Sequence, residues 1–313
     1  MSLRRHRLIG LLTAVLLLAL LAAACGAEDP MEDAAVDEPP EDADPGAVTV
    51  GSANFPESVL LANIYAGALE SSGIEVNTQL NIGSREIYFA ALEQGELDLL
   101  PEYLGSLHNH VTGGDEEITE TEELLEDLRD ELGPEILVLE PAEAQNRNAH
   151  LITPETAEEY GLETLSDLGP VSGELVAGGP PEARERPDGL PGLKEVYGIE
   201  FADYRDLDVA GPLTIESLMQ GDIDVARAYE TMGVIAEEGW INLEDDQNLL
   251  NAENVTPIIR EDAHSDEIEE TLNAVAEVLT TEELIEMNRR IEIDNEDPDL
   301  VAEDWLQENG FLD

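Results

Sequence analysis

Three β-strand patterns alternate with two amphipathic helix patterns in the first third of the chain. The strand patterns cover residues 48–52, 74–80 and 96–103, where apolar residues cluster or alternate with polar ones. The helix patterns cover residues 56–73 and 85–94; the first begins with a proline, which suits a first turn, and both stop at a glycine. This β-α-β-α-β order predicts an α/β fold with a parallel sheet, whose loops at the carboxyl ends of the strands face a ligand.

A second α/β set follows a polar segment at residues 141–152, which we interpret as a crossover, and residues 251–259 are the predicted return. The other predicted elements are helices at 121–132, 215–219, 268–279, 282–290 and 300–309, strands at 136–139, 174–177, 223–228 and 240–243, and a loop at 180–192. We therefore expect two lobes joined by two hinge crossovers. Residues 47–147 and 256–313 form the first predicted lobe, and residues 148–255 form the second.

The chain is strongly acidic, with a formal net charge of −59 from 14 Lys+Arg and 73 Asp+Glu. Such a charge excludes a nucleic-acid backbone as partner and disfavours anionic lipid. A hydrophobic content of 42% and clear apolar periodicity argue against an acidic disordered protein. Lys194 is the only lysine. This composition favours a protein that stays soluble in high salt, where repulsion between like charges is screened.

The N-terminus has the pattern of a secretory signal peptide, predicted at residues 1–24. Arg4, Arg5 and Arg7 precede an apolar run that ends in small residues. The alternative is an uncleaved membrane anchor, since the run approaches the length that spans a bilayer.

The small residues before Cys25 resemble a lipobox, in which the cysteine is acylated and becomes the new N-terminus. Ala22 stands where that pattern usually has leucine. Cys25 is the only cysteine, so no intrachain disulfide can form. Residues 25–46 are rich in Glu, Asp, Ala and Pro, which predicts a disordered tether. We expect an extracytoplasmic protein that is anchored by lipid to the outer face of the cell membrane.

Patterns for catalysis or metal binding are missing from the sequence. There is no H-E-x-x-H or Cys/His cluster, no G-x-S-x-G and no phosphate-binding loop. Acid pairs such as Asp245-Asp246 carry little information in so acidic a chain. We therefore expect no enzyme activity, no metal and no cofactor. The histidines are His6, His108, His110, His150 and His264.

Candidate binding residues follow the predicted strands. Tyr103 and Ser106 come after the third strand, Asn54 after the first, and Tyr229 after the strand at 223–228. In open α/β sheets ligands bind outside the carboxyl ends of the strands, so these side chains are placed to touch a small molecule. Packing of Tyr103 within its loop is the alternative interpretation.

Four motifs resemble those of the osmoprotectant-binding proteins of ABC importers, which capture glycine betaine, choline and related quaternary amines. They are G-E-L-D-L-L-P-E-Y-L-G-S at residues 95–106, G-S-A-N-F-P-E-S at 51–58, R-P-D-G-L-P-G-L at 186–193 and E-D-D at 244–246. The resemblance extends roughly from Val48 to the C-terminus. It implies a two-lobed periplasmic-binding-protein fold of type II connectivity, and an ABC permease subunit as partner.

The resemblance also implies roles for particular residues. Arg186 aligns with an arginine of the family's R-x-D-G segment and would bind a ligand carboxylate. Ser106 replaces a frequent threonine and keeps the hydroxyl, and Asn146 stands where an acidic residue or asparagine is common.

Asn148 and Asn254 stand at crossover positions that are often aromatic in the family. The predicted pocket is therefore more polar than usual. It could take a betaine held by hydrogen bonds or a different small polar amine, and a ligand sensor on the same scaffold is a further alternative.

Overall fold

The computed structural model describes residues 46–114, 118 and 121–312. The predicted signal peptide, Cys25 and the predicted tether up to residue 45 lie outside the described residues. Every helix in the described ranges is too short or too polar to span a lipid bilayer.

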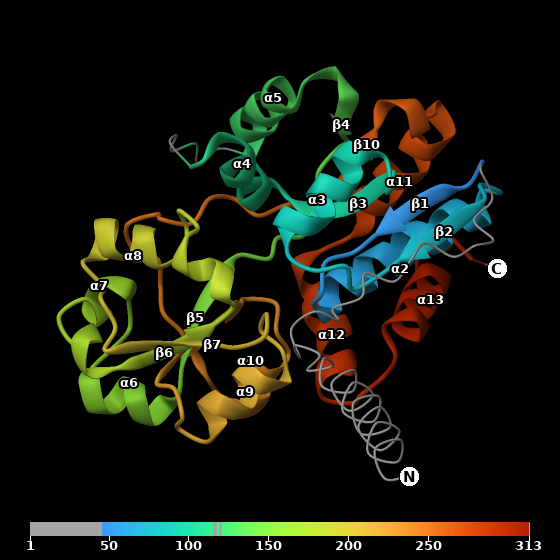
Figure 1. Cartoon of the computed structure of the whole chain (residues 1–313). Helices are drawn as coiled ribbons and strands as arrows, with labels where there is room; N and C mark the ends of the chain where they lie inside the picture. The colour runs from blue at the N-terminus through green and yellow to red at the C-terminus, as the bar shows by residue number, and fades with distance from the viewer. Residues whose placement is uncertain (1–45, 115–117, 119–120, 313) are drawn as a thin grey trace, which may run out of the picture. The chain divides into compact units, whose positions relative to one another are not determined.

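The first sheet has five strands in the order β2-β1-β3-β10-β4 (Figure 1). Its strands are β1 (Val48–Gly51), β2 (Val76–Gln79), β3 (Leu99–Tyr103), β4 (Ile136–Val138) and β10 (Val255–Arg260). The neighbours β2, β1 and β3 run parallel, as the alternating pattern predicts. β10 runs antiparallel to both β3 and β4, because it re-enters this sheet from the second one, so the prediction of a parallel sheet is wrong for this part.

The helices of the first lobe cover its sheet. They are α2 (Pro56–Ser71), α3 (Arg85–Gln94), α4 (Leu104–Thr112), α5 (Thr121–Leu132), α11 (Asp266–Val278), α12 (Thr281–Glu292) and α13 (Pro298–Glu308). α2 packs against α13 and α11 and buries apolar residues around most of its circumference. Local signals set several helix ends: Gly95 ends α3 in the left-handed conformation, and Thr280 and Glu283 form a capping box at α12.

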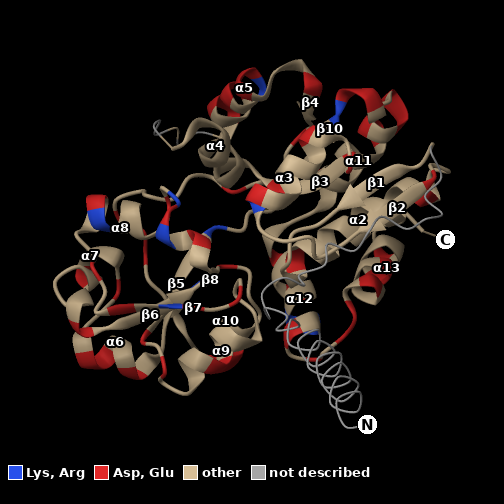
Figure 2. Ribbon diagram, viewed as in Figure 1, with Lys and Arg blue, Asp and Glu red and all other residues tan. Residues whose placement is uncertain are grey.

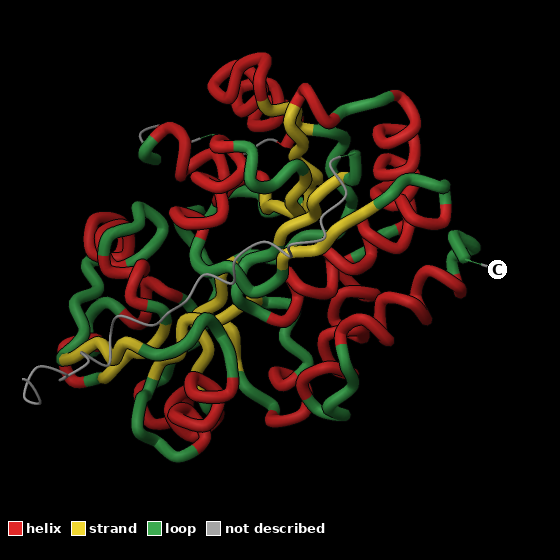
Figure 3. The backbone as a smooth tube through the Cα atoms, turned by 45° about the vertical axis from the view of Figure 1, so that its right-hand side comes forward, coloured by secondary structure: helices red, strands yellow, loops and turns green. Residues whose placement is uncertain are grey.

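The second sheet also has five strands, in the order β7-β6-β8-β5-β9. Figure 3 shows the strands of the molecule in two separate groups, each with helices around it. The strands of the second sheet are β5 (Asn148–Ile152), β6 (Val176–Gly179), β7 (Asp203–Asp206), β8 (Val225–Tyr229) and β9 (Ile241–Asn242). Its helices are α6 (Pro154–Tyr160), α7 (Leu165–Leu168), α8 (Leu190–Tyr197), α9 (Pro212–Met219) and α10 (Val234–Glu238). Val225 and its neighbour Ala226 belong to different apolar clusters, so helices bury both faces of this sheet.

Two chain segments connect the sheets, and they lie side by side. Gln145 pairs with Asn254 in an antiparallel bridge, and the Asn146 backbone N–H donates to the Glu253 carbonyl at 3.0 Å. β10 starts at Val255, so this residue pairs within the first sheet although the predicted boundary put it in the second lobe. The described residues belong to one compact unit, which contains both sheets and their connections.

Some local predictions are wrong. Residues 104–112 form α4, whereas we expected Ser106 to lie in a loop after the third predicted strand. A short 3-10 helix (Pro181–Arg184) and the start of α8 occupy the predicted loop at 180–192. Gly, Ser, Asn and His are poor helix formers, and α4 is stabilised instead by burial of residues such as Leu107 and His108. The predicted strand at 240–243 is reduced to the two residues of β9.

Candidate functional site

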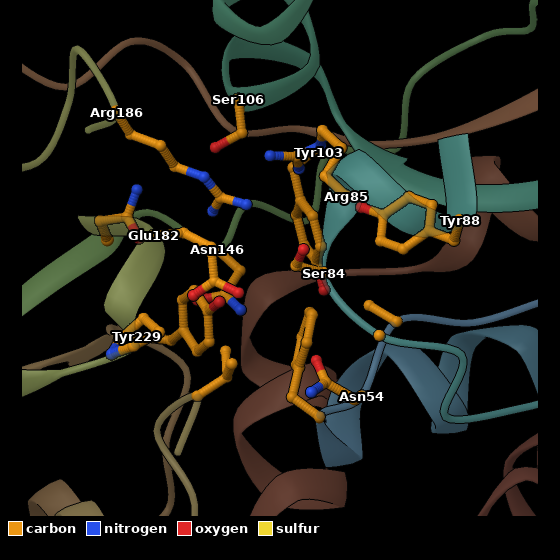
Figure 4. A pocket seen from close by; sticks show the side chains of 16 residues that line it. Asn54, Ser84, Arg85, Tyr88, Tyr103, Ser106, Asn146, Glu182, Arg186 and Tyr229 are labelled. Carbon is orange, nitrogen blue, oxygen red and sulfur yellow. The ribbon is translucent and has the colours of Figure 1, made fainter. Parts of the chain in front are cut away.

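A cavity lies where strands of both sheets end, and sixteen residues from both lobes line it (Figure 4). Its volume is about 40 Å³, and a second cavity of about 500 Å³ adjoins it and shares several lining residues. The chain reaches it directly after β1, β3, β6 and β8. This is the carboxyl edge of the parallel strands, where ligands bind in open α/β sheets.

Three of the aromatic rings that line the cavity pack against one another, with that of Phe55 between those of Tyr103 and Tyr229. Phe55 precedes the first turn of α2, Tyr103 ends β3 and Tyr229 ends β8. The centroid of the Phe55 ring lies 6.1 Å from that of Tyr103 and 5.1 Å from that of Tyr229. We did not predict Phe55, although its place between β1 and the N-terminal turn of α2 was a signal for it. These rings create an aromatic surface for a cationic head group.

The hydroxyl of Tyr103 is already engaged inside the protein. It donates to Glu57 Oε1 at 2.6 Å, and Asn146 Nδ2 donates to the same oxygen at 2.6 Å. Burial and the neighbouring Glu57 carboxylate hold the pKa of Tyr103 well above its usual range, so the hydroxyl stays protonated. Tyr103 therefore presents its ring, and not its hydroxyl, to the cavity.

Ser106 lines the cavity from the first turn of α4. Its backbone N–H and hydroxyl both donate to the Glu253 carboxylate, at 2.9 and 2.7 Å. A Cβ on the preceding Gly105 would lie 2.7 Å from the carbonyl oxygen of Ala252, so glycine permits this close approach to the return crossover. Burial raises the pKa of Glu253 to about 7, although the two bonds from Ser106 lower it.

Glu253→Gln is expected to flatten the pH dependence of stability. The folded-state pKa is about 7 against an ordinary 4.5. The contribution of Glu253 to stability is thus fully present below about pH 4.5 and is lost as the pH rises through about 7. At about 1.4 kcal/mol per pKa unit, the loss is roughly 3 kcal/mol. Urea unfolding at pH 5 and pH 8 measures it. Exposed Glu308→Gln removes the same charge as a control; parallel profiles for wild type and Glu253→Gln would contradict the assignment.

Two arginines line the cavity, and both have acidic partners. Arg85 makes a buried two-pronged ion pair with Glu102 at 2.8–3.2 Å, and Tyr88 also donates to Glu102. Arg186 extends into the cavity from the second lobe and pairs with Glu86 of α3 at 3.1 Å, through its Nε and Nη2 atoms (Figure 4). Its Nη1 atom takes no part in that pair.

The predicted asparagines have different surroundings. Asn54 is exposed at the cavity wall, and Asn148 Nδ2 donates to Asp188 at 2.8 Å. Burial alone would raise the pKa of Asp188, but the Arg227 guanidinium at 2.7 Å holds it below its usual range.

The structure brings seven of the eight predicted ligand-binding residues to one cavity. They are Asn54, Tyr103, Ser106, Asn146, Asn148, Arg186 and Tyr229. Asn254 is not among the lining residues, and we no longer include it in the site. It is buried, its Nδ2 donates to the Ala142 carbonyl at 2.8 Å and its Oδ1 accepts from Thr121, so it holds the crossover in place. Lining residues that we did not predict include Phe55, Ser84, Arg85, Tyr88 and Glu182.

The described residues contain no group of three or more His, Cys, Asp and Glu side chains placed to hold a metal ion. His108 contacts Asp127 at 2.7 Å, and His110 packs edge-on against Phe89.

Comparisons with known proteins agree with this geometry. Residues 46–308 match the family described as the substrate binding domain of ABC-type glycine betaine transport systems. The glycine-betaine-binding protein of Pseudomonas aeruginosa is 28% identical, over 84% of this chain and 88% of its own length. The glycine betaine-binding protein YehZ of Escherichia coli is 28% identical, over 89% and 95%.

The crystal structure of a glycine betaine/carnitine/choline ABC transporter superposes with a TM-score of 0.67. It is 24% identical and covers 85% of this chain and 100% of that chain, which confirms the predicted two-lobed, type II fold. The family match covers nearly all of the described residues and confirms the resemblance in the motifs. The chain therefore belongs to the family of substrate-binding domains of ABC-type glycine betaine transport systems.

Proposed function

We propose that this protein captures glycine betaine or a related quaternary amine outside the cytoplasm and delivers it to the permease of an ABC importer. One observation carries the proposal: the rings of Phe55, Tyr103 and Tyr229 line one cavity at the carboxyl ends of the strands. A trimethylammonium group has no N–H, so aromatic faces are the surface that attracts it. The names of the bacterial relatives support the same ligand class.

We assign the ligand's carboxylate to Arg186. Its guanidinium extends into the cavity, and its Nη1 atom lies outside the ion pair with Glu86 (Figure 4). Arg85 is the less suitable partner, because its hydrogen bonds to Glu102 are shorter, at 2.8–3.2 Å against 3.1–3.3 Å, and Glu102 is fully buried whereas the Glu86 side chain is 46% exposed. Asn54, Asn148 and Ser106 supply polar surface around the ligand.

Calorimetric titration with glycine betaine, choline, carnitine and a polyamine tests the proposal. We expect at least one quaternary amine to bind one-to-one, and the polyamine not to bind. Binding of the polyamine alone would favour the alternative of a different polar amine. The polar lining by Asn54 and Asn148 supports that alternative. If none of the four compounds binds to folded protein, the proposed function is wrong.

We further propose that Cys25 is acylated and anchors the protein to the outer face of the cell membrane. Cys25→Ala is expected to move the protein from the membrane fraction to the medium, or to leave an unprocessed precursor. Fractionation with metabolic labelling by a fatty acid measures both results. Lipid-labelled protein of the normal size from the mutant would contradict the proposal.

We also propose that the fold depends on salt. Asp and Glu are spread over the helices of both lobes, and the formal net charge is −59 (Figure 2). In dilute buffer the Debye length reaches about 30 Å, so like charges repel across the molecule. The melting temperature is expected to rise from 10 mM to molar NaCl. A melting temperature that does not change with salt would argue against it.

A further inference from the structure

The Glu57 carboxylate, in the first turn of α2, is 3% exposed and accepts four short hydrogen bonds. Its Oε1 accepts from the Tyr103 hydroxyl and from Asn146 Nδ2, both at 2.6 Å. Its Oε2 accepts from Thr231 Oγ1 and from Asn288 Nδ2, both at 2.5 Å. An ionised carboxylate has about four lone-pair sites, so these donors use its full capacity. Glu57 therefore acts on other parts of the protein and not on a ligand directly.

The four donors come from four different parts of the fold. Tyr103 ends β3 of the first lobe, Asn146 lies on the first crossover, and Asn288 lies on α12. Thr231 follows β8, and it alone among the four donors belongs to the second lobe. The bond between Thr231 and Glu57 is thus a direct, buried connection between the lobes.

This connection runs next to the aromatic wall of the cavity. Phe55 stands two residues before Glu57, and Tyr229 stands two residues before Thr231. The two rings face each other across the lobes with centroids 5.1 Å apart. The Glu57–Thr231 bond and the Phe55–Tyr229 ring pair therefore lie next to each other where the two lobes meet.

α12 also contacts the segment around Thr231. Asn288 Nδ2 lies 3.2 Å from the Thr231 carbonyl oxygen and 3.1 Å from its Oγ1. A Cβ on Gly233 would lie 2.5 Å from the Cα of Arg289, so the backbones of these two segments approach closely. These contacts join the segment around Thr231 in the second lobe to α12 of the first lobe.

We propose that Glu57 is a positioning residue that couples closure of the lobes to the alignment of the aromatic rings around the ligand. The inference rests on the proposed function. Opening the lobes withdraws Thr231 and removes one of the two hydrogen bonds to Oε2, while Asn288 keeps the other, and the lost bond disfavours the open state. The bond to Oε1 holds the Tyr103 ring, so closure and ring alignment occur together.

Two variants of Thr231 separate this role from simple packing. Thr231→Val removes the hydroxyl with little change in shape, and Thr231→Ser keeps the hydroxyl. X-ray scattering of the ligand-free proteins is expected to give a larger radius of gyration for Thr231→Val than for wild type and Thr231→Ser. An unchanged radius for Thr231→Val would overturn the inference, whether or not a ligand is known.

Affinity for glycine betaine gives the second readout. Thr231→Val is expected to bind about ten-fold more weakly than wild type, because the closed state loses a charge-assisted hydrogen bond, and Thr231→Ser is expected to restore binding. Tyr103→Phe removes another donor to the same carboxylate. If Glu57 couples the two, the double variant loses less affinity than the product of the single losses. Equal affinities for wild type and Thr231→Val, or strictly multiplicative losses, would contradict the coupling.

The two proposals fail in distinguishable ways. If wild type binds no quaternary amine, the proposed function is wrong, and the scattering comparison still decides whether the Glu57–Thr231 bond holds the lobes together. If wild type binds and Thr231→Val matches it in both readouts, only the inference about Glu57 is wrong.

Discussion

Replacing Phe55 by alanine is expected to weaken binding of glycine betaine by about 10- to 100-fold. Phe55 is the central ring of the three, with ring contacts at 6.1 Å to Tyr103 and 5.1 Å to Tyr229. Its removal eliminates one cation–π contact, of about 0.5–2 kcal/mol, and the Phe55–Tyr229 pair across the lobes, of about 0.5–1.5 kcal/mol, whereas the Phe55–Tyr103 pair lies within the first lobe and affects stability. Calorimetric titration at one salt concentration measures the change.

Phe89→Ala is the matched control. Phe55 and Phe89 are both buried, at 8% and 6% exposure, but Phe89 does not line the cavity. We expect both variants to lose stability and only Phe55→Ala to lose affinity. Equal affinities for the two variants would remove Phe55 from the site and weaken the proposal of a quaternary amine ligand.

Replacing Arg85 by methionine is expected to destabilise the fold by about 3–5 kcal/mol at pH 7. The Arg85 and Glu102 side chains are 9% and 0% exposed, so the change leaves a buried carboxylate without its cation. Tyr88 and the Tyr103 backbone N–H continue to donate to Glu102, but they do not neutralise it. Urea unfolding of the variant and wild type measures the difference in free energy.

The pH dependence of that difference checks its cause. An unpaired buried carboxyl avoids its charge by taking up a proton, so the destabilisation in Arg85→Met should shrink towards pH 4. Lys194 pairs with Glu200, and both side chains are more than half exposed, at 62% and 67%. Lys194→Met should therefore change stability little. A destabilisation by Arg85→Met that is constant with pH would indicate lost packing and not lost charge.

Much of the fold could be predicted from the sequence because its signals are local. The helices at 85–94 and 121–132 have the predicted bounds, since apolar spacing and glycine stops act within a few turns. The three parallel strands β1, β2 and β3 follow from the alternation of strand and helix patterns. Strands that form through pairing with a neighbouring strand, without an apolar pattern of their own, were harder to predict. The edge strand β7 is an example: three of its four residues are charged, and we did not predict it.

The candidate site could be predicted in part for the same reason. Tyr103 and Tyr229 end strands, and a strand end is visible in the sequence; both line the cavity. We did not predict Phe55 as a binding residue, because its ring lies beside Tyr103 and Tyr229 only after β3 and β8 have taken their places in the fold. We predicted that Asn254 faces the cavity, but its side chain hydrogen-bonds to the neighbouring crossover at Ala142. A crossover residue can face either way, and sequence spacing does not distinguish the two.

By itself, the sequence determined the α/β class, the order of most elements and the family resemblance, because periodicity, capping residues and motif order are properties of neighbouring residues. Only the tertiary structure decided which charges are paired and which side chains meet. Glu57 lies 46 residues from Tyr103 and 174 from Thr231 along the chain, yet it hydrogen-bonds to both. Contacts over such separations depend on how the two sheets and their crossovers pack, and no local pattern encodes that packing.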